Sequence, residues 1–132
     1  MFSQIYLKKT SNKLAKKILN TKLKKNFFKN PYKHLFIDNA IDKKLVDVCL
    51  KNFPRINKKN WEKSDIRSIE IKHRSKWESE FDIPDGLIDL VRILNSSTIL
   101  KSLSKRFSIP KLMPDPYFTG GGLNVTERGG ST

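Results

Sequence analysis

The chain has 132 residues, of which 37% are hydrophobic and 30% charged, and its net charge is +14. This length and balance suit one globular domain with its own core. No apolar run approaches the roughly 20 residues that cross a bilayer, and residues 1–30 lack the continuous apolar segment of a secretory signal. The single Cys49 excludes an internal disulfide and a cysteine-based zinc site. We therefore predict a cytoplasmic protein.

The first 37 residues hold ten lysines and no acidic residue. Residues 1–9 are predicted as a short strand or a frayed start, and a helix capped by Thr10 or Ser11 is predicted to run to about residue 26. Its apolar residues recur at spacings of three to five, so the helix is basic and amphipathic. It either packs on the fold or binds nucleic acid or an anionic membrane. The lysines for such binding are Lys8, Lys9, Lys13, Lys16, Lys17, Lys22, Lys24 and Lys25.

A strand is predicted over residues 32–38, followed by a helix over residues 43–52 that Asp42 caps. Cys49 lies on the apolar side of that helix, as a small core residue rather than a reactive thiol. Residues 55–63 are predicted as a basic loop around Trp61. Its indole either packs on a sheet or stacks on single-stranded nucleic acid.

A loose strand pattern covers residues 68–72. Two helices are then predicted, over residues 86–94 with Asp85 as the cap and over residues 98–107 with Ser97 as the cap.

The most distinctive stretch is residues 112–130, which read LMPDPYFTGGGLNVTERGG. Two prolines keep the chain out of a helix, and three glycines permit backbone angles or close approaches that a side chain would forbid. Residues 123–128 alternate as a half-buried strand does, with Leu123 and Val125 on one face and Asn124 and Thr126 on the other. A turn at residues 129–130 is predicted to end the strand.

This stretch resembles the entry to the catalytic barrel of the Fe(II)/2-oxoglutarate-dependent dioxygenases, in the branch similar to prolyl 4-hydroxylase. Residues 31–40, PYKHLFIDNA, are similar to an opening strand of that branch, and residues 94–96 and 109–110 also fit. The resemblance runs from about residue 31 to residue 132. It implies an oxidoreductase, a hydroxylase, on a double-stranded β-helix or jelly roll.

The resemblance also implies a His-x-Asp iron motif just beyond Thr132, with a distal histidine and a basic anchor for 2-oxoglutarate later still. We therefore expect a truncated, N-terminal fragment that binds no cofactor itself and is inactive alone, with Fe(II) and 2-oxoglutarate bound by the full-length protein. Its partners would be the remainder of the barrel and a small-molecule or protein substrate. Leu123 and Val125 would then lack an opposite sheet.

No metal site is predicted within the chain, because its only histidines, His34 and His73, do not form a ligand set. The resemblance suggests that Asn124, Thr126 and Arg128 line the mouth of the barrel near cosubstrate or substrate. The alternative is a solvated strand face with no role in binding.

Together these patterns predict an α+β fold, with packing helices and the first strands of an incomplete barrel. A basic arm over residues 1–30 would precede an oxygenase-like part over residues 31–132. The function expected first is that of a dioxygenase fragment. The alternatives are a small basic module for nucleic acid or an anionic membrane, and an inert gene remnant.

Overall fold

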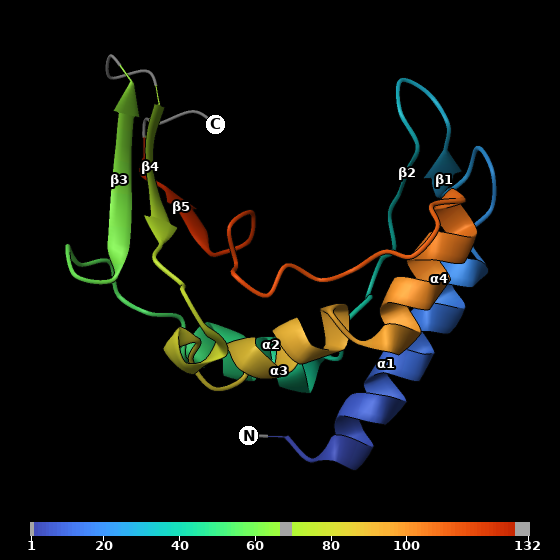
Figure 1. Ribbon diagram of the computed structural model, residues 1–132, viewed down its shortest axis with the longest axis horizontal. Coiled ribbons are helices and arrows are strands. Elements are labelled where there is room, and N and C mark those ends of the chain that lie inside the picture. The colour runs from blue at the N-terminus through green and yellow to red at the C-terminus, as the bar shows by residue number, and fades with distance from the viewer. Residues whose placement is uncertain (1, 67–69, 129–132) are drawn as a thin grey trace. The chain divides into compact units, whose positions relative to one another are not determined.

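The computed structural model describes residues 2–66 and 70–128. The chain divides into two compact units: a helical unit, Met1–Asn52 with Asp85–Pro114, and a sheet unit, Phe53–Pro84 with Asp115–Thr132. Over the described residues the fold has four α-helices and two small antiparallel sheets (Figure 1). The predicted α+β class is confirmed, and neither sheet closes on itself.

Helix α1 (Gln4–Leu19) starts earlier than the sequence pattern suggested. The Ser3 hydroxyl accepts a hydrogen bond from the Tyr6 backbone N–H at 3.2 Å, and this capping contact sets the start of the helix. The predicted cap at Thr10 or Ser11 is wrong, because both residues are buried inside the helix. The strand or frayed start expected over residues 1–9 is also wrong, because α1 begins at Gln4 and occupies most of that span.

The buried face of α1 packs on helix α4, and α1 also contacts helix α3. Leu14 and Ile18 are buried, whereas Leu19 and Leu23 are exposed. The helix ends at Leu19, so the predicted end near residue 26 is wrong. The basic amphipathic character is confirmed, with its apolar side used for packing. The buried side consists of Leu7, Thr10, Ser11, Leu14, Ala15 and Ile18.

Strands β1 (Phe27–Phe28) and β2 (His34–Leu35) form a short antiparallel hairpin within the helical unit. β2 lies inside the span predicted for a strand. The Phe27 ring is buried under the guanidinium of Arg106, which stands 3.7 Å from the ring centroid. Arg106 also donates to the Thr21 hydroxyl at 2.8 Å and to the Thr21 carbonyl at 3.0 Å, so α4 holds the chain where it leaves α1.

Helices α2 (Lys43–Lys51), α3 (Leu87–Leu94) and α4 (Ser97–Phe107) match the predicted spans closely, but their caps differ. Asp42 takes the cap position of α2 without a capping hydrogen bond. Gly86, not Asp85, precedes α3, with a φ of 80° that favours glycine. Ser96, not Ser97, caps α4 by accepting the Ile99 N–H at 3.3 Å.

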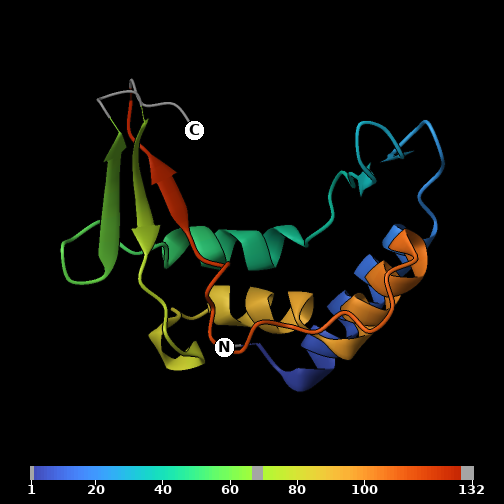
Figure 2. The same ribbon diagram turned by 45° about the horizontal axis from the view of Figure 1, so that its top comes forward.

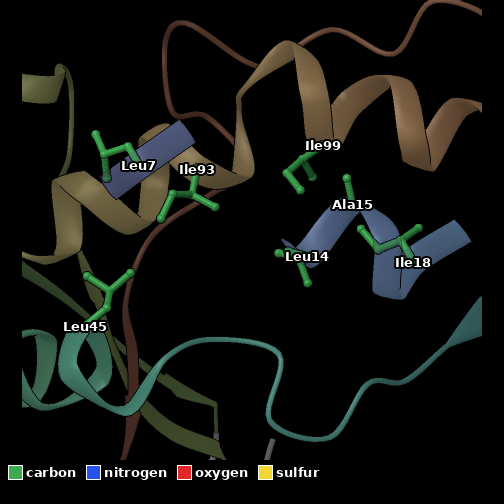
Figure 3. Packing of buried hydrophobic residues seen from close by; sticks show 7 residues of the cluster. All are labelled: Leu7, Leu14, Ala15, Ile18, Leu45, Ile93 and Ile99. Carbon is green, nitrogen blue, oxygen red and sulfur yellow. The ribbon is translucent and has the colours of Figure 1, made fainter. Parts of the chain in front are cut away.

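The core of the helical unit gathers residues from all four helices (Figure 3). Leu45 and Ile93 are fully buried, and Ile99 is 1% exposed. Cys49 is half-buried and packs against this cluster, and burial raises the pKa of its thiol, with the nearby charge of Asp89 acting in the same direction. Cys49 thus lies on the apolar side of α2 as predicted, but it is only partly buried.

The sheet unit contains strands β3 (Trp61–Ile66), β4 (Glu70–Ser75) and β5 (Asn124–Thr126), with a 3-10 helix, η1 (Glu80–Asp82). The strands are antiparallel in the order β3-β4-β5, side by side in Figure 2. Strand β3 replaces part of the expected basic loop, and β4 extends past the strand pattern at residues 68–72. Residues 67–69 lie outside the described residues, as does the turn predicted at 129–130.

Trp61 opens strand β3 and is only 3% exposed. Its indole N–H donates to the Arg55 carbonyl at 3.1 Å, and its ring packs against Phe53 at a centroid distance of 6.2 Å. Trp61 is therefore no stacking platform for nucleic acid, because its ring is buried inside the sheet unit.

Candidate functional site

Strand β5 carries the residues that the sequence placed at a substrate mouth. Asn124 and Thr126 are exposed and Val125 between them is half-buried, which confirms the predicted alternation. The strand covers three residues rather than the predicted six. Arg128 is exposed in a turn after the strand, so the structure brings Asn124 and Thr126 together on one face but does not include Arg128 in that strand.

The pairing of β5 with β4 adds two cationic residues to this face. Arg74 stands opposite Asn124, and Lys72 stands opposite Thr126. Directly opposed residues of an antiparallel pair project to the same side of the sheet. We call these four residues the polar face of the sheet unit: Lys72, Arg74, Asn124 and Thr126.

The loop before β5 is organised by the carboxylate of Asp115. It accepts backbone N–H groups from Tyr117 at 2.9 Å, from Thr119 at 2.6 Å and from Gly120 at 3.3 Å. The hydrogen bond from Tyr117 contributes most to holding the pKa of Asp115 below its ordinary value, since each N–H stabilises the charged form. The aspartate between the two prolines thus folds the glycine-rich loop around itself.

Arg74 connects the loop to the polar face. Its guanidinium donates to the Thr119 carbonyl, so its orientation is fixed by the same loop that Asp115 holds. A hollow of about 230 Å³ lies beside it, with Trp77 and Phe118 in its lining. Their rings meet edge to face at 6.5 Å. The carboxylates of Glu62 and Glu78 also line the hollow, so it combines charges of both signs with aromatic surface.

Ser75 attaches the start of β5 to the end of β4. Its hydroxyl accepts the Leu123 N–H at 2.8 Å, and its own N–H donates to the Leu123 carbonyl at 3.0 Å. A Cβ added to Gly122 would stand 3.0 Å from the Ser75 hydroxyl, so this glycine permits the close approach that the sequence suggested. At Gly120 and Gly121 a Cβ would meet nothing within 4 Å.

The other face of the sheet carries His73, which stands opposite Val125. The His73 ring is buried and shares a hydrogen bond with the Glu127 carboxylate. His34 belongs to the helical unit, where its ring contacts the Tyr32 carbonyl at 2.8 Å. Among the described residues no group of three or more possible ligands is gathered around a metal-sized space.

Arg74 and Ser75 are the site residues that the sequence did not indicate. They lie about 50 residues before β5, and only the strand register shows that they meet it. A signal was present, because Lys72 and Arg74 alternate with His73 and Ser75 as a two-faced strand requires. The predicted strand ends at residue 72, so most of this alternation lies beyond it.

Comparison of the chain with protein-family models, with curated proteins and with solved structures finds no match. Within the part of the chain that the structure describes, no helix has both the length and the apolar character needed to span a bilayer. The candidate site therefore rests on its own geometry. That geometry offers two cations, an amide and a hydroxyl on one sheet face, and the exposed carboxylate of Glu62 stands opposite Arg74 on the same face. Such a face suits a ligand with both anionic and hydrogen-bond-donating groups.

Proposed function

We propose that this chain is the N-terminal part of an Fe(II)/2-oxoglutarate-dependent oxygenase, in which β4 and β5 are the first strands of a double-stranded β-helix. One observation carries the proposal. The Pro-Asp-Pro and glycine stretch forms a loop held by Asp115, and it delivers a strand whose Asn124 and Thr126 share a face with Arg74. The resemblance to the oxygenases implies such a loop and strand at the entry to the barrel, next to the substrate mouth.

The free edge of β5 supports the same proposal. In the described residues the strand order is β3-β4-β5, so β5 pairs with β4 on one side only. An edge strand presents unpaired N–H and C=O groups, to which a further antiparallel strand can add. In the proposed oxygenase that addition continues the barrel wall and pairs the free edge of β5.

The described residues do not fit an iron centre of their own. A facial triad needs two histidines and a carboxylate on one site, but His73 is buried against Glu127 and His34 lies in the other unit. No step of the iron chemistry is therefore assigned to these residues. Bound Fe(II) and 2-oxoglutarate would supply oxygen activation from the remainder of the barrel.

The part proposed for this chain is to bind and orient the substrate or cosubstrate. Arg74 offers a guanidinium whose position is fixed by the Thr119 carbonyl, and it can pair with a carboxylate. The exposed Asn124 can both donate and accept hydrogen bonds. Groups held in place before the reaction lose little entropy on binding, which lowers the barrier by positioning.

The first test is the coding sequence after Thr132. We expect the same reading frame to encode a His-x-Asp pair within a few residues. A frame that continues without it contradicts the proposal.

The second test uses the protein that the complete frame encodes. It should convert 2-oxoglutarate to succinate with Fe(II) under air, measured by succinate formation. Asn124→Ala should raise the KM of substrate or cosubstrate on the order of tenfold. The reason is that one lost hydrogen bond of about 1.4 kcal/mol corresponds to a tenfold change in binding. Asn12→Ala, at an exposed helix position, is the matched control and should leave both constants unchanged.

A further inference from the structure

The β1–β2 hairpin of the helical unit presents a row of aromatic rings. Phe28 and His34 stand opposite each other, with centroids 5.3 Å apart and planes 18° from parallel. Phe36 stacks on Phe28 at 6.0 Å and 17°, and Tyr32 meets His34 at 5.3 Å. We call this set the aromatic row, in the order Phe36, Phe28, His34, Tyr32.

The two ends of the aromatic row are open to solvent. Tyr32 is 70% exposed and Phe36 is 50% exposed, although large apolar rings usually gain by being covered. The Tyr32 carbonyl fixes the His34 ring through the 2.8 Å contact with Nδ1, so the row is held in place by the hairpin itself. The row thus offers two accessible ring surfaces, one at each end.

Exposed lysines flank the aromatic row along the chain. Lys24 and Lys25 precede β1, and Lys29 and Lys33 lie in the connection between the strands, all with exposed side chains. Residues 1–37 contain no acidic residue, so no carboxylate from this segment neutralises them. Lys33 also donates to the Phe107 carbonyl at 3.3 Å, which fixes one cation beside Tyr32.

We propose that the hairpin binds single-stranded nucleic acid. Bases stack on Tyr32 and Phe36, and phosphates contact the flanking lysines. Stacking platforms combined with a cationic track are how proteins hold single strands without reading their sequence. Paired bases are inaccessible to rings at a hairpin edge, so a duplex should bind less tightly. This proposal is independent of the oxygenase proposal, because the two sites share no residue and belong to different units.

The observations favour nucleic acid over an anionic membrane. The hairpin exposes a short row of stacked rings with lysines next to it in the sequence, whereas a membrane-surface helix buries one continuous apolar face. The apolar face of α1 is already used for packing against α4 and α3. The nearby α1 lysines would then extend the electrostatic track.

The experiment measures binding of the full chain to a fluorescein-labelled 20-mer of deoxythymidine, by fluorescence anisotropy between 50 and 200 mM NaCl. We expect the affinity to fall with salt, with a slope of about −0.7 for each phosphate contacted. A 20-bp duplex of mixed sequence should bind at least several-fold more weakly. No detectable binding to the single strand at 50 mM NaCl would overturn the proposal.

The decisive variant is Tyr32→Leu with Phe36→Leu, which keeps apolar bulk and removes both open rings. We expect a loss of affinity of roughly tenfold or more, from two lost stacking contacts. The pair Tyr32→Phe with Phe36→Tyr keeps both rings and should bind as the unaltered chain does. Equal affinity of the leucine variant, with an unchanged circular dichroism spectrum, would refute the stacking role.

A second variant tests the charge without touching the rings. Lys24→Gln with Lys25→Gln should weaken binding and reduce the salt slope by about 0.7 to 1.4. Lys51→Gln with Lys101→Gln removes the same charge from exposed helix positions elsewhere in the helical unit and should have the smaller effect. Equal effects of the two pairs would show non-specific attraction by net charge and overturn the site.

Vesicles containing 30% phosphatidylserine provide the membrane comparison. We expect the leucine variant to retain whatever vesicle binding the unaltered chain shows, because that binding would not depend on ring stacking. If the chain binds vesicles but not the oligonucleotide, and the leucine variant loses vesicle binding, the hairpin is a membrane surface and the proposal is wrong.

Discussion

The helical unit and the sheet unit are held together by different interactions. In the helical unit, apolar side chains from four helices meet in one cluster, and Leu45 and Ile93 have no exposed surface. In the described part of the sheet unit, the buried hydrophobic residues are Trp61 and Ile83. Polar contacts there do much of the ordering, through Asp115, Arg74 and Ser75.

This difference predicts how substitutions in each unit affect the protein. Apolar burial contributes roughly 25 cal/mol per Å² and is sensitive to lost volume. A hydrogen bond contributes a net 0.5–1.5 kcal/mol or so, but it fixes direction. We therefore expect substitutions in the helical unit to affect global stability, and substitutions in the sheet unit to affect the local order of the candidate site.

The largest effect should come from Ile93→Ala in α3. The substitution leaves a cavity in the fully buried cluster, so we expect the free energy of unfolding to fall by about 2–5 kcal/mol. Urea denaturation followed by circular dichroism measures the loss. Ile5→Ala is the matched control, since Ile5 is 77% exposed, and should change stability by less than about 0.5 kcal/mol. Similar losses for both would contradict the packing described.

Gly86→Ala should have the next largest effect. At a φ of 80° an added Cβ would lie 2.7 Å from Val48 Cγ1 and 3.2 Å from the Cys49 nitrogen. We expect a loss of about 1–3 kcal/mol from backbone strain and crowding, measured in the same denaturation. Gly121→Ala is the control, because its Cβ would meet nothing within 4 Å. A neutral Gly86→Ala would show that α2 and α3 can move apart at little cost.

Ser75→Ala tests the junction of β4 and β5 in the sheet unit. It removes the hydroxyl that accepts the Leu123 N–H, so we expect about 1–3 kcal/mol of local destabilisation. Hydrogen exchange of the Leu123 amide, followed by NMR, should accelerate while amides of α1 stay protected. Ser97→Ala, at an exposed position of α4, serves as the comparison. Unchanged exchange at Leu123 would mean that the hydroxyl does not hold the strand.

The smallest effect concerns the pH dependence of the Asp115 loop. The pKa of Asp115 is lowered in the folded chain, so its carboxylate stabilises the ordered loop. This stabilisation is complete above the ordinary aspartate pKa of about 3.9, and it is lost as the pH falls through the lower folded pKa. NMR shifts of the Thr119 and Gly120 amides should follow that titration. Asp115→Asn should abolish it. A midpoint above 3.9 would reverse the assigned sign.

The spans of the helices were predictable where the apolar residues form a single stripe along one face. The spans of α2, α3 and α4 follow from apolar residues at helical spacing. The start of α1 was not predictable, because Thr10 and Ser11 look like capping residues in the sequence but lie on the buried face of the helix. Small polar residues allow two helices to approach closely. Whether Thr10 and Ser11 serve this purpose depends on α4, about 90 residues away, so the local sequence does not show it.

The strands were less predictable, because whether a segment forms a strand depends on the segment with which it pairs. Residues 61–66 read WEKSDI, without a clear apolar alternation, yet they pair with β4 along their whole length. For the candidate site, alternation identified Asn124 and Thr126. Arg74 and Ser75 depend on the register between β4 and β5, which local sequence does not encode.

The helical unit is discontinuous along the chain, and this has a consequence for its synthesis on the ribosome. Helix α1 is made first, but its main partner α4 emerges about 80 residues later, after the central segment Phe53–Pro84. The part of α1 that packs on α3 and α4 stays exposed during that interval, when chaperones have access to it. Slowing translation between residues 53 and 84 should therefore lengthen the period in which the nascent chain can be captured.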